Sequence, residues 1–180
     1  MAKYTMDMVL EYAKVFYENR DEGNDSNNAA KKAKKMGGKY VINGYFTDEE
    51  QITQLLAEGL DPMPMGNARV KEGNNFGIGK YIQISRFHNH LMEFENKKGG
   101  QTKVDFGGAP TVVDLTKGAE NKRRWTFDMG ELGNGTAAKV QFETYSQGAG
   151  LRLLALGVQN HVAWEGNVPT EDDELFILED

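Results

Sequence analysis

The chain has 180 residues, of which 39% are hydrophobic and 27% charged, and this composition is that of a single globular domain. It contains no cysteine, which excludes a disulfide scaffold, a thiolate metal site and a cysteine nucleophile. No apolar run approaches the roughly 18 residues of a membrane span, and the first residues lack the pattern of a signal peptide. We therefore expect an intracellular protein that does not contact a membrane.

The net charge of −6 is concentrated at the C-terminus. Residues 171–180 (EDDELFILED) contain six acidic and no basic residues, whereas the whole chain has 27 acidic and 21 basic residues. The first 170 residues are therefore formally neutral. A terminal block of like charge stays solvated and often acts as an interaction tail. We divide the chain into a domain over residues 1–168 and an acidic, partly hydrophobic tail over residues 169–180.

Apolar residues alternate with a period of two along most of the chain, which predicts β-strands. In the second of these strands, Tyr40 and Ile42 fall on one face and Val41 and Tyr45 on the other. Gly157 is expected to mark a bulge in the last one. The predicted strands cover residues 8–17, 39–46, 79–88, 111–115, 138–145 and 151–162.

One helix is predicted after the second strand. Thr47 is expected to be its N-cap and Glu50 the capping-box partner, while Gly59 ends the helix. The apolar stripe of this helix consists of Ile52, Leu55 and Leu56.

The remaining segments are expected to be loops and turns. Residues 25–38 (DSNNAAKKAKKMGG) are polar and basic without an apolar face, which predicts a long flexible loop. Further loops are expected at residues 66–79 and 117–124, and a hairpin turn at residues 97–101. This pattern predicts an all-β fold with one short helix, namely a five-stranded, antiparallel, OB-fold-like barrel with long loops.

Catalytic signatures are missing from the sequence, which lacks GxGxxG, GxxxxGK[ST], HExxH and GxSxG. His88 and His90 could share a metal ion, but no third ligand has the spacing to join them, so surface histidines are the simpler interpretation. Asp105, Asp114 and Asp128 could converge in a small metal-dependent nuclease, although no pattern favours this. We nominate no catalytic residue, no metal site and no cofactor, and we expect no enzymatic activity.

Basic residues next to aromatic rings are the pattern that indicates a function. Cations neutralise phosphates, and a flat ring stacks on any base without reading its identity. A single strand tyrosine is more often a packing residue, so the prediction depends on the repetition of these pairs. The cations predicted to line a groove are Lys39, Lys80, Arg86, Lys122, Arg123, Arg124 and Arg152, and the rings predicted to stack on bases are Tyr40, Tyr81, Phe87 and Trp125.

The C-terminal third carries a more specific order of motifs. APTVVDLTKG (109–118) is followed by ELGNGTAAKVQFETYSQ (131–147), then by GAGLRLLALGVQNHV (148–162) and the acidic tail with Phe176. This order resembles the single-stranded DNA-binding proteins of bacteriophage replication. The resemblance extends over roughly residues 8–180. The chain departs from the family in a longer, more basic segment at 117–130 and in a tail whose phenylalanine is not the last residue.

The resemblance implies an OB-fold that coats single-stranded DNA in phage replication and recombination, in the cytoplasm of the infected bacterium. It also implies that the tail binds the phage DNA polymerase and helicase-primase. The tail residues concerned are Glu171, Asp172, Asp173, Glu174, Leu175, Phe176, Ile177, Leu178, Glu179 and Asp180. Two other classes stay open: a phage structural or assembly protein that docks through residues 175–178, and the nuclease. The sequence is compatible with a monomer and with a homodimer.

Overall fold

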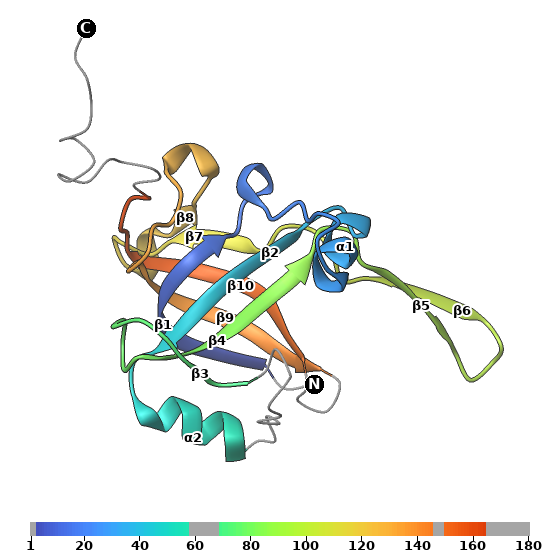
Figure 1. Ribbon diagram of the computed structural model, residues 1–180, viewed down its shortest axis with the longest axis horizontal. Helices are drawn as coiled ribbons and strands as arrows, with labels where there is room; N and C mark the ends of the chain where they lie inside the picture. The colour runs from blue at the N-terminus through green and yellow to red at the C-terminus, as the bar shows by residue number, and fades with distance from the viewer. Residues whose placement is uncertain (1–2, 58–68, 146–149, 165–180) are drawn as a thin grey trace, which may run out of the picture.

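Five long strands form a ring in the computed structural model, which describes residues 3–57, 69–145 and 150–164 (Figure 1). These strands are β1 (Lys3–Lys14), β2 (Lys39–Phe46), β4 (Lys80–Phe87), β9 (Ala137–Tyr145) and β10 (Gly150–Asn160). The pairs β1–β2, β2–β4, β1–β9 and β9–β10 are antiparallel. A parallel pairing of Ser85 in β4 with Arg152 in β10 closes the ring. The predicted β-rich, barrel-like fold is confirmed, although this closing pair is parallel and not antiparallel as expected.

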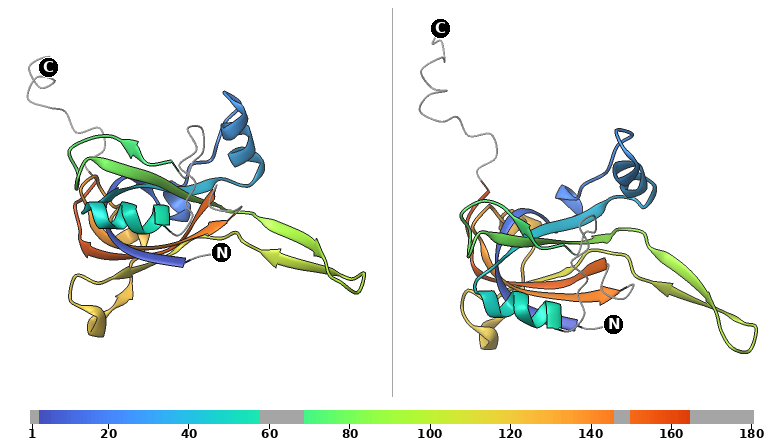
Figure 2. Two further views of the ribbon diagram at one scale, coloured as in Figure 1. Left: turned by 90° about the horizontal axis from the view of Figure 1, so that it is seen from below. Right: turned by 60° about the horizontal axis from the view of Figure 1, so that its bottom comes forward.

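Shorter elements extend the ring and fill its connections. The strands are β3 (Lys71–Glu72) beside β4, β7 (Thr111–Asp114) beside β10, and β8 (Arg123–Arg124) beside β7. Strands β5 (Leu91–Glu95) and β6 (Gln101–Asp105) form a separate hairpin that projects from the barrel in both views of Figure 2. The helices are α1 (Asn28–Lys35), α2 (Glu49–Ala57) and the short 3₁₀ turns η1 (Tyr17–Asn19), η2 (Ala119–Asn121) and η3 (Phe127–Met129).

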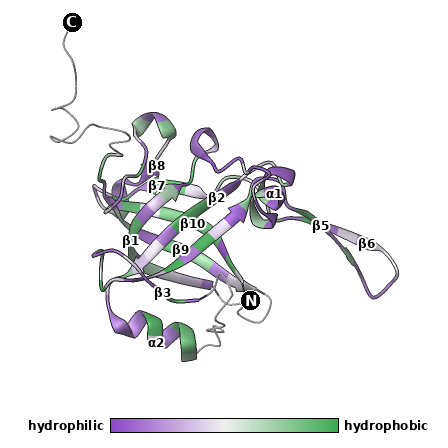
Figure 3. Cartoon of the chain, in the orientation of Figure 1, coloured by the Kyte–Doolittle hydropathy of each residue, from purple (hydrophilic) through white to green (hydrophobic). Residues whose placement is uncertain are grey.

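The core lies inside the ring because alternate strand residues point inward and are apolar. Figure 3 shows these apolar positions along the strands and on α2. Burial of each large side chain contributes about 1.5–3 kcal/mol. Fully buried members include Met8, Leu10, Ile42, Phe46, Ile82, Ile84, Val140, Phe142 and Leu153. Within the described ranges, no helix has the length and apolar character needed to cross a membrane.

The segment expected to be a flexible loop contains helix α1. The Asn27 side chain caps it by accepting a hydrogen bond from the Ala30 N–H at 2.8 Å. Ala33 is completely buried, so the helix does have an inward side, formed by one small residue. A single alanine among lysines gives no apolar stripe, and for this reason the sequence pattern did not reveal the helix. Strand β1 likewise begins at Lys3, five residues before the predicted start.

Helix α2 occurs as predicted, with its cap shifted by one residue. The Gln51 N–H donates to Asp48 Oδ1 at 3.1 Å, while the Gln51 side chain accepts from the Thr47 N–H at 2.8 Å. Asp48 therefore caps the helix, and Thr47 and Glu50 do not have the predicted roles. Ile52 and Leu55 are buried, whereas Leu56 is exposed. The predicted stop at Gly59 lies outside the described residues.

Gly157 does not mark a bulge. It pairs in register with Lys139, and the irregular steps of β10 fall between Leu153 and Ala155 and between Val158 and Asn160. A Cβ atom at position 157 would lie 2.3 Å from Leu115 Cδ1. A larger residue here would displace the Leu115 side chain, which packs directly on the strand.

Candidate nucleic-acid interface

Strands β2 and β4 present an outward surface, which we name the β2–β4 face. Its residues alternate with the buried Ile82 and Ile84, so their side chains point away from the core. The register places Lys39 opposite Phe87 at one end and Tyr45 opposite Tyr81 at the other. The half-buried members of the face are Lys39, Val41, Asn43, Tyr81, Gln83, Ser85 and Phe87.

Four rings continue from the Phe87 end of this face onto the β5–β6 hairpin, and we name them the aromatic row. Phe87 meets His90 edge-on with centroids 5.5 Å apart, and His90 lies 5.8 Å from Phe106. Phe106 in turn meets Phe94 at 6.3 Å. The Lys32 ammonium of α1 lies 5.4 Å from the centre of the Phe87 ring. The aromatic row thus begins beside a cation and ends on an exposed phenylalanine.

Arg86 holds the root of this hairpin. Its guanidinium donates to the carbonyl oxygens of Gly107 at 2.7 Å and Leu153 at 3.1 Å. Burial, followed by the charge of Arg152, lowers the pKa of Arg86 from its ordinary value. The side chain was predicted to contact phosphate, but its Nη1 and Nη2 groups bind the backbone of β10 and of the hairpin root.

Arg152 is buried beneath the aromatic row. Its Nη1 lies 2.8 Å from Glu143 Oε1, and its guanidinium stacks 4.1 Å from the centre of the Phe106 ring. Burial and the nearby Arg152 charge lower the pKa of His90, so this imidazole is neutral near pH 7. The structure brings four predicted site residues to one end of the barrel, namely Lys39, Arg86, Phe87 and Arg152. Only Lys39 and Phe87, which pair with each other in the β2–β4 register, face outward.

Two of the predicted stacking rings lie in the interior. Tyr40 has no exposed surface, and its hydroxyl lies 2.7 Å from His88 Nδ1. Burial raises the pKa of Tyr40. Trp125 is 7% exposed, and its Nε1–H donates to the Gly130 carbonyl at 2.9 Å. Neither ring has a free face for a base, contrary to the prediction from the sequence.

Lys80 and Tyr81 lie at the far end of the β2–β4 face. The Lys80 ammonium is 3.1 Å from Glu49 Oε1 at the start of α2. The Tyr81 ring packs on the buried Tyr45 ring with centroids 5.0 Å apart, which leaves part of Tyr81 exposed. This end therefore offers a ring and a partly neutralised cation.

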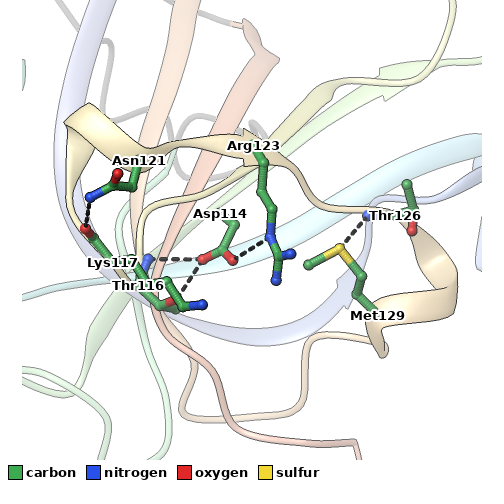
Figure 4. A network of polar contacts seen from close by, with 7 residues as sticks. All are labelled: Asp114, Thr116, Lys117, Asn121, Arg123, Thr126 and Met129. Atoms are coloured by element: carbon green, nitrogen blue, oxygen red, sulfur yellow. Dashed lines mark hydrogen bonds and ion pairs between the residues drawn. The ribbon is translucent and has the colours of Figure 1, made fainter.

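Lys122, Arg123 and Arg124 belong to a different part of the barrel. They lie on and before β8, at the opposite end of the strand order from β3 and β4 (Figure 1). Figure 4 shows what fixes this segment: Asp114 accepts hydrogen bonds from the Thr116 hydroxyl at 2.6 Å and from Arg123 Nε at 3.3 Å. The Thr116 hydrogen bonds, with Arg123, lower the pKa of Asp114. All three basic residues are exposed, but they do not join the β2–β4 face.

The carboxylates of the nuclease hypothesis are not assembled into a metal site. Both Asp114 oxygens are engaged by Thr116 and Arg123, as described above. Asp105 accepts from the Gly107 N–H at the hairpin root. Over residues 3–57, 69–145 and 150–164, no group of three or more histidine, aspartate or glutamate side chains is placed to hold an ion.

Several exposed rings were not nominated from the sequence. Tyr12, Tyr17, Phe94 and Trp164 all have large exposed surfaces. None of these rings has a basic residue as its direct neighbour in the sequence; Lys14 lies two residues after Tyr12, and Arg20 lies three residues after Tyr17. The tail residues 171–180 and the boundary at residues 168–169 lie outside the described residues.

Neither the scan of protein-family models nor the search of curated proteins finds a match. Among solved structures, the chain is similar to gp2.5, a single-stranded DNA-binding protein encoded by bacteriophage T7, with a TM-score of 0.41 and 16% identity. The match covers 99% of this chain and 97% of that chain. A TM-score below 0.5 at this identity does not establish a common family.

Proposed function

We propose that this chain is a single-stranded DNA-binding protein that coats DNA without reading its sequence. The observation that supports this function best is the aromatic row, which leads from the β2–β4 face to the exposed Phe94 with Lys32 at its start. Each base stacked on such a ring contributes about 1–3 kcal/mol, and every base has a π-face. No catalytic residue takes part.

The position of the β2–β4 face supports the same proposal. β2 and β4 are the second and third strands of the five-stranded ring in chain order. In OB-fold barrels this face, together with the loop between the first two strands, binds oligonucleotides. Here that loop carries α1 and Lys32. From Tyr81 to Phe87 the face extends for about 20 Å, enough for several bases.

The cations of the proposed path have two different roles. Lys32 and Lys39 stand beside Phe87 and would contact phosphates directly. Arg86 is half-buried and Arg152 is buried. Both act indirectly, because they position the root of the hairpin and the Phe106 ring. The basic segment of Lys122, Arg123 and Arg124 would contact DNA only where the strand continues around the barrel.

The acidic tail is proposed to have two functions in phage replication and recombination. Its six carboxylates would compete with DNA for the cations, and residues 175–178 would bind the phage polymerase and helicase-primase. Deletion of residues 170–180 should then tighten DNA binding. Unchanged DNA affinity of the truncated protein would contradict this competition. Binding of replication proteins would then be the only proposed function of the tail.

Fluorescence anisotropy of labelled oligo-dT tests the proposal. We expect saturable binding of an oligonucleotide of about 20 nucleotides, with similar affinity for mixed sequences. Stable oligomers without affinity for oligo-dT would contradict the proposal and support the assembly protein. Metal-dependent cleavage of the oligonucleotide would support the nuclease hypothesis.

A further inference from the structure

Tyr12 has an unusual backbone conformation. Its φ is 51°, and it is the one non-glycine residue with a positive φ among those that the structure describes. The left-handed region is strained for a bulky side chain, and such strain is retained where the surroundings impose it, often at binding sites. Here the β1–β2 register shifts between Glu11 and Lys14, and the Tyr12 N–H donates to Asn134 Oδ1 at 2.8 Å.

The strained backbone turns the Tyr12 ring toward solvent. The ring residue is 63% exposed, whereas its neighbours Glu11 and Ala13 are buried. In a regular strand, alternation would turn residue 12 inward, because Met8 and Leu10 point into the core. The conformation therefore costs free energy and yields an exposed ring.

Trp164 is the second exposed ring at this end of the barrel, with 61% of its surface accessible. The backbone before it is fixed, because Ala163 bridges Leu132 and the Gly133 N–H donates to the Val162 carbonyl at 2.7 Å. A Cβ atom at Gly133 would lie 2.5 Å from the Ala163 carbonyl oxygen, so the two segments are in close contact.

Both rings line one surface hollow of about 310 Å³. An exposed cation, Lys14, lies on its wall. The other lining residues are Ala13, Asn19, Glu131, Leu132 and Asn134. Flat rings with a neighbouring ammonium are the groups that bind a nucleobase and its phosphate.

We propose that this hollow is a second nucleobase site, in which a base of single-stranded DNA stacks on Tyr12 and Trp164 while Lys14 contacts a phosphate. This inference depends on the proposed DNA-binding function and extends it beyond the β2–β4 face. Tyr17, five residues after Tyr12, has its ring 5.2 Å from His88, next to the aromatic row. Five residues span at most about 18 Å, so one strand can occupy both sites.

Tryptophan fluorescence of the full-length protein reports on this site. Trp125 is 7% exposed and Trp164 is 61% exposed, so quenching that accompanies oligo-dT binding comes from Trp164. We expect saturating oligo-dT to quench emission and to protect Trp164 from acrylamide. The Trp164→Phe variant should no longer show this quenching of emission, but it should still bind labelled oligo-dT.

The outcomes separate this inference from the function on which it depends. If anisotropy shows binding while emission and acrylamide quenching stay constant, the second site is wrong and the proposed function stands. If anisotropy shows no binding, the proposed function itself is wrong. A dimer that dissociates in the Trp164→Ala variant would assign the hollow to a second copy and overturn the inference.

The Tyr12→Asn variant provides an independent test. Asparagine tolerates a positive φ, so the fold is retained while the ring is removed. We expect oligo-dT affinity to fall about 5- to 150-fold without a lower melting temperature. A lower melting temperature with unchanged affinity would show a purely structural role and contradict the inference. Leu91→Ala, an exposed residue on the hairpin, is the control that should change neither quantity.

Discussion

The guanidinium carbon of Arg152 lies 4.1 Å from the centre of the Phe106 ring, and its Nη1 lies 2.8 Å from Glu143 Oε1. These contacts join β10 and β9 to the root of the β5–β6 hairpin. The charge of Arg152 is thereby neutralised within the protein, and the residue supports a ring of the aromatic row instead of presenting a cation to solvent.

Replacement of Arg152 by alanine should therefore affect stability first. It would leave the Glu143 carboxylate buried without its partner, and breaking such a pair costs about 3–5 kcal/mol. Urea unfolding should show this loss for Arg152→Ala. Lys122→Ala, at an exposed position, should change the free energy of unfolding by less than about 0.5 kcal/mol. Equal stability of the two variants would contradict the role given to Arg152.

Phe87 should contribute to DNA affinity more than to stability. Loss of one stacked base costs about 1–3 kcal/mol, so Phe87→Ala should weaken oligo-dT binding about 5- to 150-fold. Leu91→Ala is the matched control. Leu91 lies on the face of the hairpin opposite Phe94, the last ring of the aromatic row, and is therefore not expected to contact DNA. Phe87→Leu keeps most of the volume and removes the ring. Full affinity of this leucine variant would exclude stacking at Phe87.

Lys32 should contribute to the salt dependence of DNA affinity. A neutral barrel with three to five phosphate contacts predicts a slope of log affinity against log salt of roughly −2 to −3.5, at about 0.7 per phosphate. Lys32→Ala should make this slope shallower by about 0.7. Lys34→Ala on the same helix is the control, since Lys34 pairs with Asp25 at 3.1 Å. A wild-type slope steeper than about −6 would contradict the neutral-barrel account.

His90 should make stability depend on pH. Burial and the Arg152 charge keep its folded pKa below the 6.5 of the unfolded chain. Between these values the unfolded state binds a proton that the folded state does not, so stability rises with pH and is fully present above about 6.5. The urea midpoints at about pH 5.5 and about pH 7.5 measure how much stability changes between these two pH values, and this change should be smaller in His90→Gln. An unchanged difference in the variant would contradict this assignment.

The strands could be predicted from the sequence because alternation is a local property. β2 occupies residues 39–46 as predicted, with Tyr40 and Ile42 on one face. Alternation does not reveal which face is covered, and for this reason Tyr40 was expected to stack on bases although it lies in the core. The conformation of Tyr12 is set by Asn134, which is 122 residues away in the chain, and no local pattern predicts such a contact.

Competition between single- and double-stranded DNA tests the central claim most directly. Labelled oligo-dT bound to the full-length protein is displaced with unlabelled strands of mixed sequence, and then with a duplex of the same length. Because stacking requires unpaired bases, we predict that the single strands displace the label at concentrations similar to oligo-dT, while the duplex requires at least about tenfold more. Equal displacement by the duplex would show that phosphate attraction alone drives binding, and it would contradict the aromatic row as the basis of recognition.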